Sequence, residues 1–240
     1  MKARLTDWKP SWRRDSKSPW CGRTAVRPFS LGRVRVVAIM VTVYTWTTPN
    51  GRKPLILLEE LDLPYEVVPV NLREHEQFAP EFLAISPNNK IPALKDGSLT
   101  LFESGAILTY LAEKYDRFLA SEGTQRYRTL QWLHWQVGGL GPMLGQLGFF
   151  VKEGIALPKE HFIAEAERLL NVLDRTLAGS PYVAGDHYTI ADIACYPWTE
   201  AAASHLELNL SGKPAVQRWL AQVGDRPAVR KAMAWKPGNP

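Results

Sequence analysis

Cysteine is scarce in this chain of 240 residues, which contains only Cys21 and Cys195. The two are far apart and form no CxxC pair, so the sequence indicates neither a disulfide framework nor a cysteine metal cluster. Two such thiols fit a reducing compartment, and we expect a cytoplasmic protein. The histidines are dispersed, without HExxH or comparable spacing, and we therefore expect no metal. They are His75, His134, His161, His187 and His205.

Long apolar runs are also missing. No stretch of the sequence is apolar over the length needed to span a bilayer, so we expect no membrane partner. The hydrophobic content of 45% and the charged content of 22% are ordinary for a globular chain with a full core. The length fits one large domain or two small ones.

Excess positive charge is confined to the amino-terminal segment. Residues 1–39 hold ten Lys/Arg and two Asp/Glu, a net charge of +8, whereas residues 40–240 hold 19 Lys/Arg and 22 Asp/Glu, a net charge of −3. The body is therefore mildly acidic, and no nucleic-acid partner is expected. We interpret 1–39 as a disordered basic tail, upstream of a true start at Met40. A functional basic arm and a transit peptide are the alternatives.

The apolar pattern of the first half predicts a β-α-β unit. It places a strand at 42–45, a helix at 51–61 and a second strand at 65–72. This order predicts a parallel pair joined by a right-handed crossover. Pro69 interrupts the second strand and favours an edge position in the sheet.

A hairpin and a further helix are predicted next. Two short apolar runs, IPAL and LTLF, are separated by Asp96-Gly97, which is a strong hairpin signal. Glu103 then opens a helix with one apolar side, SGAILTYLAEKY. With a short helix in EHEQFAPEF, the first domain has the order β-α-β-α-β-β-α over 40–117.

The second half contains no predicted strand. Four segments are typical of helices, and a change of composition near 117–124 marks the boundary before them. The fold class is therefore a small α/β domain followed by an all-helical domain, 124–240. The four segments are TQRYRTLQWLHWQVGGLGPMLGQL, HFIAEAERLLNVLDRTLA, TIADIACYPWTEAAASHL and KPAVQRWLAQV.

Four stretches together resemble the glutathione transferase family. NNKIPAL is similar to the family's strand that begins at a cis-proline, and FESGAILTYL to its glutamate-serine turn before a helix. GDHYTIADIACYPW is similar to the buried capping box of the second domain. TPNG, with QWLHWQVGGLGPMLGQ, resembles the bacterial nu-class transferases, also described as disulfide-bond oxidoreductases. The resemblance covers nearly everything after Met40. It implies a thioredoxin-like first domain, glutathione as substrate and a homodimer.

Two pairs of residues suit glutathione. A cis bond before Pro92 would turn the N–H and C=O of Ile91 outward, where they could pair with a peptide. Glu103 and Ser104 stand at a predicted helix N-terminus, which favours an anion. Together they suit the ammonium and carboxylate of a γ-glutamyl group. An ordinary turn proline and an ordinary capping pair are the alternatives.

The TPNG corner lacks the cysteine that redox members of the thioredoxin-like fold carry there, so the nucleophile has to come from the ligand. One hydrogen bond to a charged group is worth roughly 1.5–3 kcal/mol, enough to lower a thiol pKa by about one to two units. Thr48 and Asn50 are the candidates for holding a glutathione thiolate, and Gly51 lets the backbone approach closely. Thr47 is an alternative to Thr48. Tyr44 resembles the activating tyrosine of other classes but is expected to pack within its strand.

Other residues have narrower expected roles. The resemblance implies that Gln77 reaches the glycyl end of glutathione, although a solvated loop amide is the alternative. Lys90 could receive a carboxylate. Cys195 lies in a predicted buried helix and is expected to be a packing residue rather than a redox thiol. Thr189 and Asp192 match a capping box, which we interpret as structural.

A second ligand or acceptor site is implied by the helical half. Nu-class proteins tend to carry an arginine early in the second long helix of the bundle, and that position falls here at His161, a weaker partner for a carboxylate. Neighbouring lysines could compensate. Residues 138–150 hold five glycines and a proline. This segment is either a kinked core helix or the wall of an acceptor site that includes Met143 and Gln146.

These observations predict a glutathione-dependent enzyme. The bound thiolate, held by Thr48 and Asn50, would attack a disulfide or another electrophile. A non-catalytic glutathione-binding regulatory protein on the same scaffold is the alternative, because a fold does not fix a function.

Overall fold

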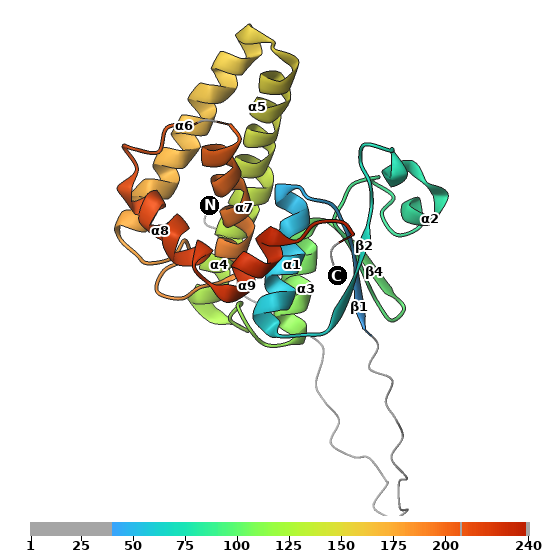
Figure 1. Cartoon of the computed structure of the whole chain (residues 1–240). Helices are drawn as coiled ribbons and strands as arrows, with labels where there is room; N and C mark the ends of the chain where they lie inside the picture. The colour runs from blue at the N-terminus through green and yellow to red at the C-terminus, as the bar shows by residue number, and fades with distance from the viewer. Residues whose placement is uncertain (1–39, 207, 239–240) are drawn as a thin grey trace, which may run out of the picture. The chain divides into compact units, whose positions relative to one another are not determined.

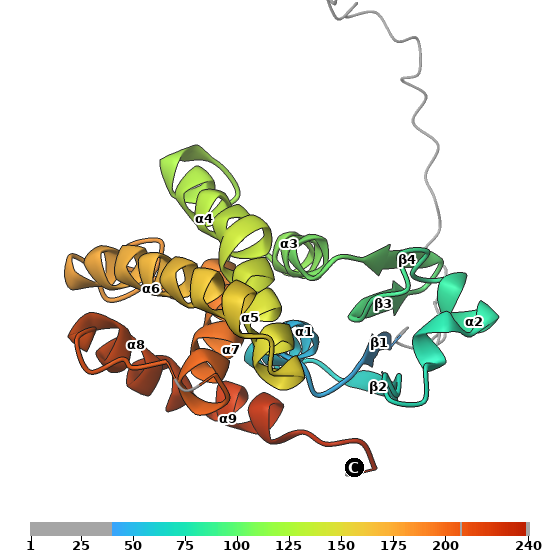
Figure 2. The ribbon, with the colours of Figure 1, turned by 90° about the horizontal axis from the view of Figure 1, so that it is seen from above.

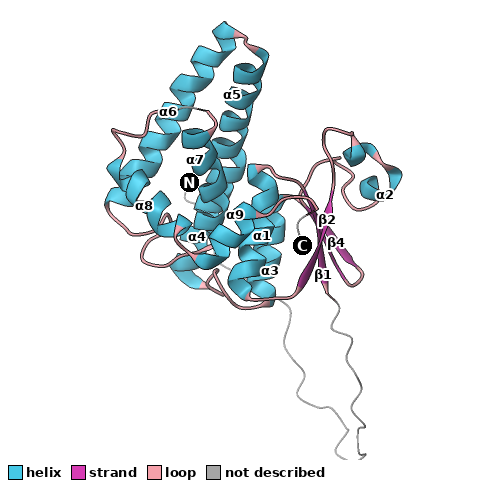
Figure 3. Cartoon of the chain, viewed as in Figure 1, coloured by secondary structure: helices cyan, strands magenta, loops and turns pink. Residues whose placement is uncertain are grey.

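The computed structural model of the protein describes residues 40–206 and 208–238, so the prediction for the basic tail, 1–39, falls outside the described residues. One sheet comes first and helices make up the rest, as Figure 1 and Figure 3 show. The first part contains β1 (Val41–Thr45), α1 (Pro49–Leu61), β2 (Tyr65–Pro69), a 3-10 turn η1 (Glu76–Phe78), α2 (Pro80–Leu83), β3 (Ala93–Asp96), β4 (Leu99–Phe102) and α3 (Ser104–Lys114).

The strands form one sheet in the order β2-β1-β3-β4. β1 and β2 are parallel, as their helical crossover predicts, and Val43 stands opposite Val67. β2 lies at an edge, which confirms the expectation from Pro69. β3 and β4 form the predicted antiparallel hairpin, in which Gly97 has a φ of 61°. A positive φ is favourable for glycine, so the conformation of the turn explains why Gly97 stands there.

The two faces of the sheet have different partners (Figure 2). Successive side chains of a strand point to opposite faces, so Val41 and Val43 face α1 and α3 while Tyr44 faces α2. There Tyr44 packs with Phe82 of α2, with 6.4 Å between the ring centroids. The expectation that Tyr44 packs within its strand is therefore consistent with its position on the face away from α1.

Helices make up the second part of the described chain, where the predicted long helix beginning near residue 124 is divided into three pieces. One short helix, α9, has no counterpart among the predicted segments. The elements are α4 (Gly123–Trp135), a π-helical turn η2 (Gln136–Leu140), α5 (Gly141–Glu153), α6 (Ala156–Ala178), α7 (Ile190–Ser204), α8 (Pro214–Gly224) and α9 (Pro227–Ala234). None of the helices described in 40–206 and 208–238 is both long and apolar enough to cross a membrane.

α1 is the element that both domains share. It contacts α3 in the first domain and α7 and α9 in the second. Arg52 of α1 donates to the carbonyl oxygens of Ala232, at 2.9 Å, and of Trp235, at 2.6 Å. The end of α9 is therefore held beside the start of α1.

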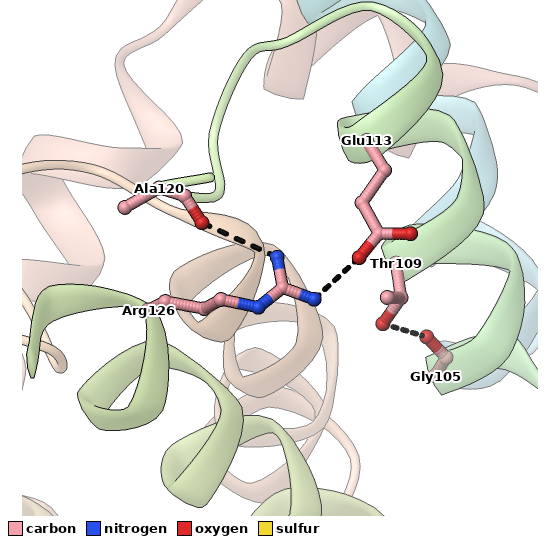
Figure 4. Close-up of polar contacts among 5 residues, drawn as sticks. All are labelled: Gly105, Thr109, Glu113, Ala120 and Arg126. Atoms are coloured by element: carbon pink, nitrogen blue, oxygen red, sulfur yellow. Dashed lines mark hydrogen bonds and ion pairs between the residues drawn. The ribbon is translucent and has the colours of Figure 1, made fainter. Parts of the chain in front are cut away.

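A second connection joins α3 to α4 (Figure 4). Arg126 of α4 donates to the carbonyl oxygen of Ala120, at 3.3 Å, and pairs with Glu113 of α3. Within α3, the Thr109 hydroxyl donates to the carbonyl oxygen of Gly105 at 2.9 Å. These contacts hold the segment between the two domains against both of them.

The predicted capping box opens α7. The carboxylate of Asp192 is fully buried and accepts from the backbone N–H of Val183, at 2.9 Å, and of Thr189, at 3.0 Å. It also accepts from Nε1 of Trp219 at 2.9 Å. These donors come from three different parts of the helical domain, and Asp192 links them, so the capping box stabilises the fold.

Candidate functional site

The TPNG corner joins β1 to α1. Thr48 is the N-cap residue of α1, and its hydroxyl accepts the N–H of Gly51 at 3.1 Å. Because the oxygen accepts, the hydroxyl proton remains available for donation to a ligand. A Cβ at position 51 would lie 2.1 Å from the carbonyl oxygen of Trp46 and 2.5 Å from Oγ1 of Thr45. Only glycine fits there, because the corner packs closely against Thr45 and Trp46.

The Asn50 side chain is held by a residue from the other domain. Nε1 of Trp198, in α7, donates to Oδ1 of Asn50 at 2.8 Å. An indole N–H can only donate, so this contact fixes which end of the amide faces Trp198. The NH2 group of Asn50 therefore points away from the indole, and Asn50 lines the cavity next to it.

A cavity of about 440 Å3 opens beside the corner, between the two domains. We call it the polar cleft. A smaller hollow of about 160 Å3 shares Asn50, Lys90, Glu103 and Ser104 with it and adds Ile91 and Pro92. Six of the residues predicted from sequence to meet glutathione are thus brought together. The polar cleft is lined by Asn50, Lys53, Lys90, Glu103, Ser104, Gln136, Val137, Gly141, Pro142, Gly145, Gln146 and Trp198.

The backbone around the smaller hollow has the predicted form. The Ile91-Pro92 peptide bond is cis. No hydrogen bond within the described residues uses the N–H or C=O of Ile91. Glu103, the N-cap of α3, has a φ of 70°, and Ser104 follows it as the first, largely buried residue of the helix. A peptide donor–acceptor pair and a helix N-terminus therefore face the same small volume.

A second cavity, of about 600 Å3, also borders Trp198. We call it the outer pocket. Its lining includes Thr47 and Thr48 of the corner, together with apolar residues such as Leu144, Pro197 and Met233. Trp198 and Gly145 line both cavities. The corner therefore borders two cavities with different lining residues.

The glycine-rich segment fits closely around the site. A Cβ on Gly141 would lie 2.6 Å from Nε2 of Gln136, and a Cβ on Gly145 would lie 3.3 Å from the Trp198 ring. The segment begins with a π-helical turn and its residues line both cavities. Both expectations, an irregular helix and a wall of the site, describe part of what is observed.

Some predicted residues are not brought to the cavities. Met143, His161 and Gln77 line neither the polar cleft nor the outer pocket. His161 is exposed on α6, and Oε1 of Gln77 is buried without a hydrogen-bond partner among the described residues. Gln146 does line the polar cleft. The roles of these residues stay predictions.

Cys195 lies in the core of the helical domain. Its side chain is fully buried in α7. Burial raises the pKa of the Cys195 thiol, with a further contribution from Asp192. A thiol is a poor nucleophile when it is inaccessible and protonated, so its surroundings fit a packing role.

Three residues of the site were missed by the sequence analysis: Lys53, Gln136 and Trp198. Lys53 is only 1% exposed, and its Nζ donates to Oγ of Ser104, at 3.2 Å, and to Oε1 of Gln136. Burial lowers the pKa of Lys53 to about 7. A signal existed in the sequence, because Lys53 shares a helical face with Leu57, four positions later.

Carboxylates and thiols do not cluster elsewhere in a way that suggests a metal. Within the part of the chain that the structure describes, no group of three or more His, Cys, Asp or Glu residues could hold a metal ion.

The fold and the site together define a two-domain protein of the thioredoxin-like class. The family model "Glutathione S-transferase, N-terminal domain" matches residues 40–113, and "Glutathione S-transferase, C-terminal domain" matches 158–227. With the relatives described next, these matches show that the chain belongs to the glutathione S-transferase family, as the sequence resemblance implies.

Three relatives illustrate the similarity. Disulfide-bond oxidoreductase YfcG of Escherichia coli is 48% identical over 204 residues, which cover 81% of this chain and 94% of YfcG. A glutathione transferase family member from Pseudomonas fluorescens Pf-5, solved with two glutathione bound, has a TM-score of 0.79 and 44% identity, covering 82% of this chain and 94% of that one. A glutathione transferase from Pseudomonas putida, solved with one glutathione disulfide per subunit, has a TM-score of 0.79 and 43% identity, covering 83% and 93%.

Proposed function

We propose that this protein is a glutathione-dependent thiol–disulfide oxidoreductase and transferase whose nucleophile is the thiolate of bound glutathione. The observation that carries the proposal is the Asn50 amide. Trp198 accounts for its oxygen, which leaves its NH2 group to donate to a ligand, and Asn50 lines the cleft at a corner that has no cysteine. A donor held in this way suits a sulfur anion supplied by the ligand.

The relatives support the same chemistry. YfcG is named a disulfide-bond oxidoreductase, and both Pseudomonas structures are described with glutathione or its disulfide. The donor set of the present chain fits this ligand. The backbone of Ile91 suits the cysteinyl peptide group, Glu103 the ammonium, and Ser104 the carboxylate of the γ-glutamyl end. Lys90 and Gln77 are proposed to meet the glycyl carboxylate end.

The corner would lower the pKa of the bound thiol. The Thr48 hydroxyl and the Asn50 amide each offer a proton, and each hydrogen bond to the anion is worth roughly 1.5–3 kcal/mol. Since about 1.4 kcal/mol corresponds to one pKa unit, one such bond lowers the thiol pKa by about one to two units. Thr47 remains the alternative to Thr48, because both line the outer pocket.

The reaction is an exchange of sulfur–sulfur bonds. The glutathione thiolate attacks one sulfur of a disulfide, forming a mixed disulfide while the other sulfur leaves as a thiolate. A second glutathione thiolate then attacks the mixed disulfide, which releases glutathione disulfide and the second thiol. The two electrons that reduce the substrate come from two glutathione molecules, and no protein thiol takes part. The same thiolate could attack an electrophile in a transferase reaction.

The acceptor is proposed to enter from the outer pocket, whose lining is mostly apolar. A second glutathione is proposed near Gln146 in the polar cleft, with Met143 and His161 as more distant candidates. The homodimer and the cytoplasmic location stay proposals as well. A non-catalytic glutathione-binding regulator is the alternative in a different class, and it differs in having no turnover.

Turnover of hydroxyethyl disulfide with excess glutathione and a coupled reductase tests the proposal. We expect activity that survives Cys195→Ala and falls by about 10- to 100-fold in Asn50→Ala, which is the loss of one hydrogen bond to a charged group. If wild-type protein binds glutathione without turnover, the oxidoreductase proposal fails and the regulator is favoured. If Cys195→Ala abolishes turnover in a folded protein, the ligand-supplied nucleophile is wrong.

A further inference from the structure

Lys53 is a buried cation with neutral partners. It belongs to α1 and lines the polar cleft, and its two hydrogen-bond acceptors, Oγ of Ser104 and Oε1 of Gln136, carry no charge. No ion pair within residues 40–206 and 208–238 includes it. Lys213, the other buried lysine of this part of the chain, pairs with Glu167. A buried ammonium without a carboxylate calls for an explanation, because desolvation of a charge is costly.

The neighbouring amide has an unused donor. Gln136 is 0% exposed and lines the polar cleft, yet its Nε2 finds no acceptor among the described residues. Gly141 keeps that nitrogen free of contact with a side chain, since a Cβ there would lie 2.6 Å from it. Buried polar groups are nearly always hydrogen-bonded, so an unpaired donor on a residue that lines a cavity points to an acceptor supplied by a ligand.

The Ser104 hydroxyl completes the set. Its oxygen accepts from Lys53, so its proton is available for donation elsewhere. Ser104, Gln136 and Lys53 therefore offer protons to one cavity. A carboxylate carries a negative charge and can accept several such donors. The α-carboxylate of a γ-glutamyl group is the one that the proposed function brings next to Ser104.

The charge of Lys53 depends on its surroundings. Burial is the largest influence and lowers the pKa of Lys53 to about 7, while Cys195 of α7 and Glu103 at the start of α3 act in the opposite direction. Lys90 lies across the same cavity. A carboxylate bound close to Lys53 would favour the ammonium form and raise that pKa.

We propose that Lys53 is the buried counter-charge of the γ-glutamyl carboxylate, and that it takes up a proton from solvent when this carboxylate binds. Lys53 acts through Ser104 and is therefore a positioning residue rather than a catalytic one. The inference rests on the proposed binding of glutathione and adds to it a coupling between ligand and proton. Binding of glutathione would then carry its own pH dependence, separate from that of the thiol.

Titration calorimetry with S-methylglutathione tests the coupling, because this ligand keeps both carboxylates and has no thiol to ionise. Measuring the binding enthalpy in buffers of different ionisation enthalpy gives the number of protons taken up. At pH 8 we expect wild-type protein to take up about half a proton or more per ligand, and at pH 5.5 close to none, because Lys53 is then already charged. Lys53→Met should lose the uptake at pH 8 and bind roughly tenfold or more weakly at pH 5.5.

Lys90→Met is the matched control, because it removes a positive charge from the same cavity at a more accessible lysine. It should bind more weakly but keep the wild-type proton uptake. Any proton taken up by the ligand's own ammonium is common to all three proteins, so the difference between them reports Lys53.

Binding to wild type with no uptake at either pH, or with equal uptake in Lys53→Met, overturns the coupling and leaves the proposed function standing. Failure of wild type to bind overturns both. If Lys53→Met does not fold, Lys53→Gln takes its place in the same comparison.

Discussion

Two buried charged side chains, Asp192 of α7 and Lys53 of α1, differ in how completely their hydrogen bonds are satisfied. Asp192 and Lys53 are 0% and 1% exposed. The carboxylate of Asp192 receives hydrogen bonds from two backbone N–H groups and the Trp219 indole. Lys53 has two neutral acceptors, and the Gln136 amide beside it has a nitrogen with no acceptor in the described part of the chain.

This difference in hydrogen bonding distinguishes a charge that stabilises the fold from a charge whose counter-ion is supplied by a ligand. A fully satisfied polar network makes a fold specific, because every donor in it has one acceptor and one geometry. An incompletely satisfied network next to a cavity is costly to the fold, so it is better explained by binding. The predictions that follow either break this comparison or sharpen it.

The largest effect is expected from Asp192→Ala. The substitution leaves the buried N–H groups of Val183 and Thr189 and the Trp219 indole without their acceptor. We expect the free energy of unfolding to fall by about 3–5 kcal/mol, measured by urea denaturation. Asp186→Ala, which alters an exposed carboxylate in the preceding loop, is the control and should be nearly neutral. A loss below about 1 kcal/mol for Asp192→Ala would remove the structural side of the comparison.

Lys53→Met should stabilise the folded protein, whereas Asp192→Ala destabilises it, and the size of the stabilisation should depend on pH. The pKa of Lys53 is about 7 in the folded protein against 10.5 for an ordinary lysine, so between these values the unfolded state binds more protons. The contribution of Lys53 to stability therefore rises with pH through this window, by at most about 1.4 kcal/mol per pH unit. Below pH 7 the full cost of the buried charge is present.

Urea denaturation of wild type and Lys53→Met from pH 6 to 9.5 checks this sign. The variant should be the more stable protein, relative to wild type, at pH 6, and its advantage should shrink as pH rises. Lys95→Met, at an exposed lysine of β3, should show no such trend. A variant whose disadvantage is large and independent of pH would mean that Lys53 is as structural as Asp192.

The smallest effect is expected from Trp198→Phe, which keeps an aromatic ring in the lining of both cavities but removes the N–H that holds Asn50. The Asn50 amide is then free to rotate, so turnover of hydroxyethyl disulfide should fall by about 3- to 10-fold. The ultraviolet absorbance of the bound thiolate should appear at higher pH than in wild type. Combining the change with Asn50→Ala should add little, because both act on one hydrogen bond. Trp132→Phe is the control, and additive losses would contradict the positioning role.

Local elements of the fold could be predicted from sequence because their causes are local. The corner after β1, the hairpin at Asp96-Gly97 and the capping box of α7 each depend on a few adjacent residues. The sequence also indicated Asn50, Ile91 and Ser104 as parts of one site, since the family resemblance supplied their meeting point. These residues indeed share the cavity system beside the corner.

The rest depends on contacts that no local pattern encodes. Lys53 meets Ser104 and Gln136 across 51 and 83 positions, and Trp198 meets Asn50 across 148. A lysine on an apolar helix face is usually read as exposed until a partner is known. Helix α9 is eight residues long and packs on α1, so its stability comes from tertiary contact rather than from its own sequence.

Arg52 has a practical consequence for anyone preparing this protein. Arg52 follows Gly51 of the corner in sequence. Its guanidinium donates hydrogen bonds to the carbonyl oxygens of Ala232 and Trp235. A change in the carboxyl-terminal residues can therefore shift the start of α1 and with it the site. A purification tag fused behind Trp235, or an expression fragment shortened before it, would disturb these hydrogen bonds. Kinetic constants of tagged and untagged protein need to agree before any site variant is interpreted.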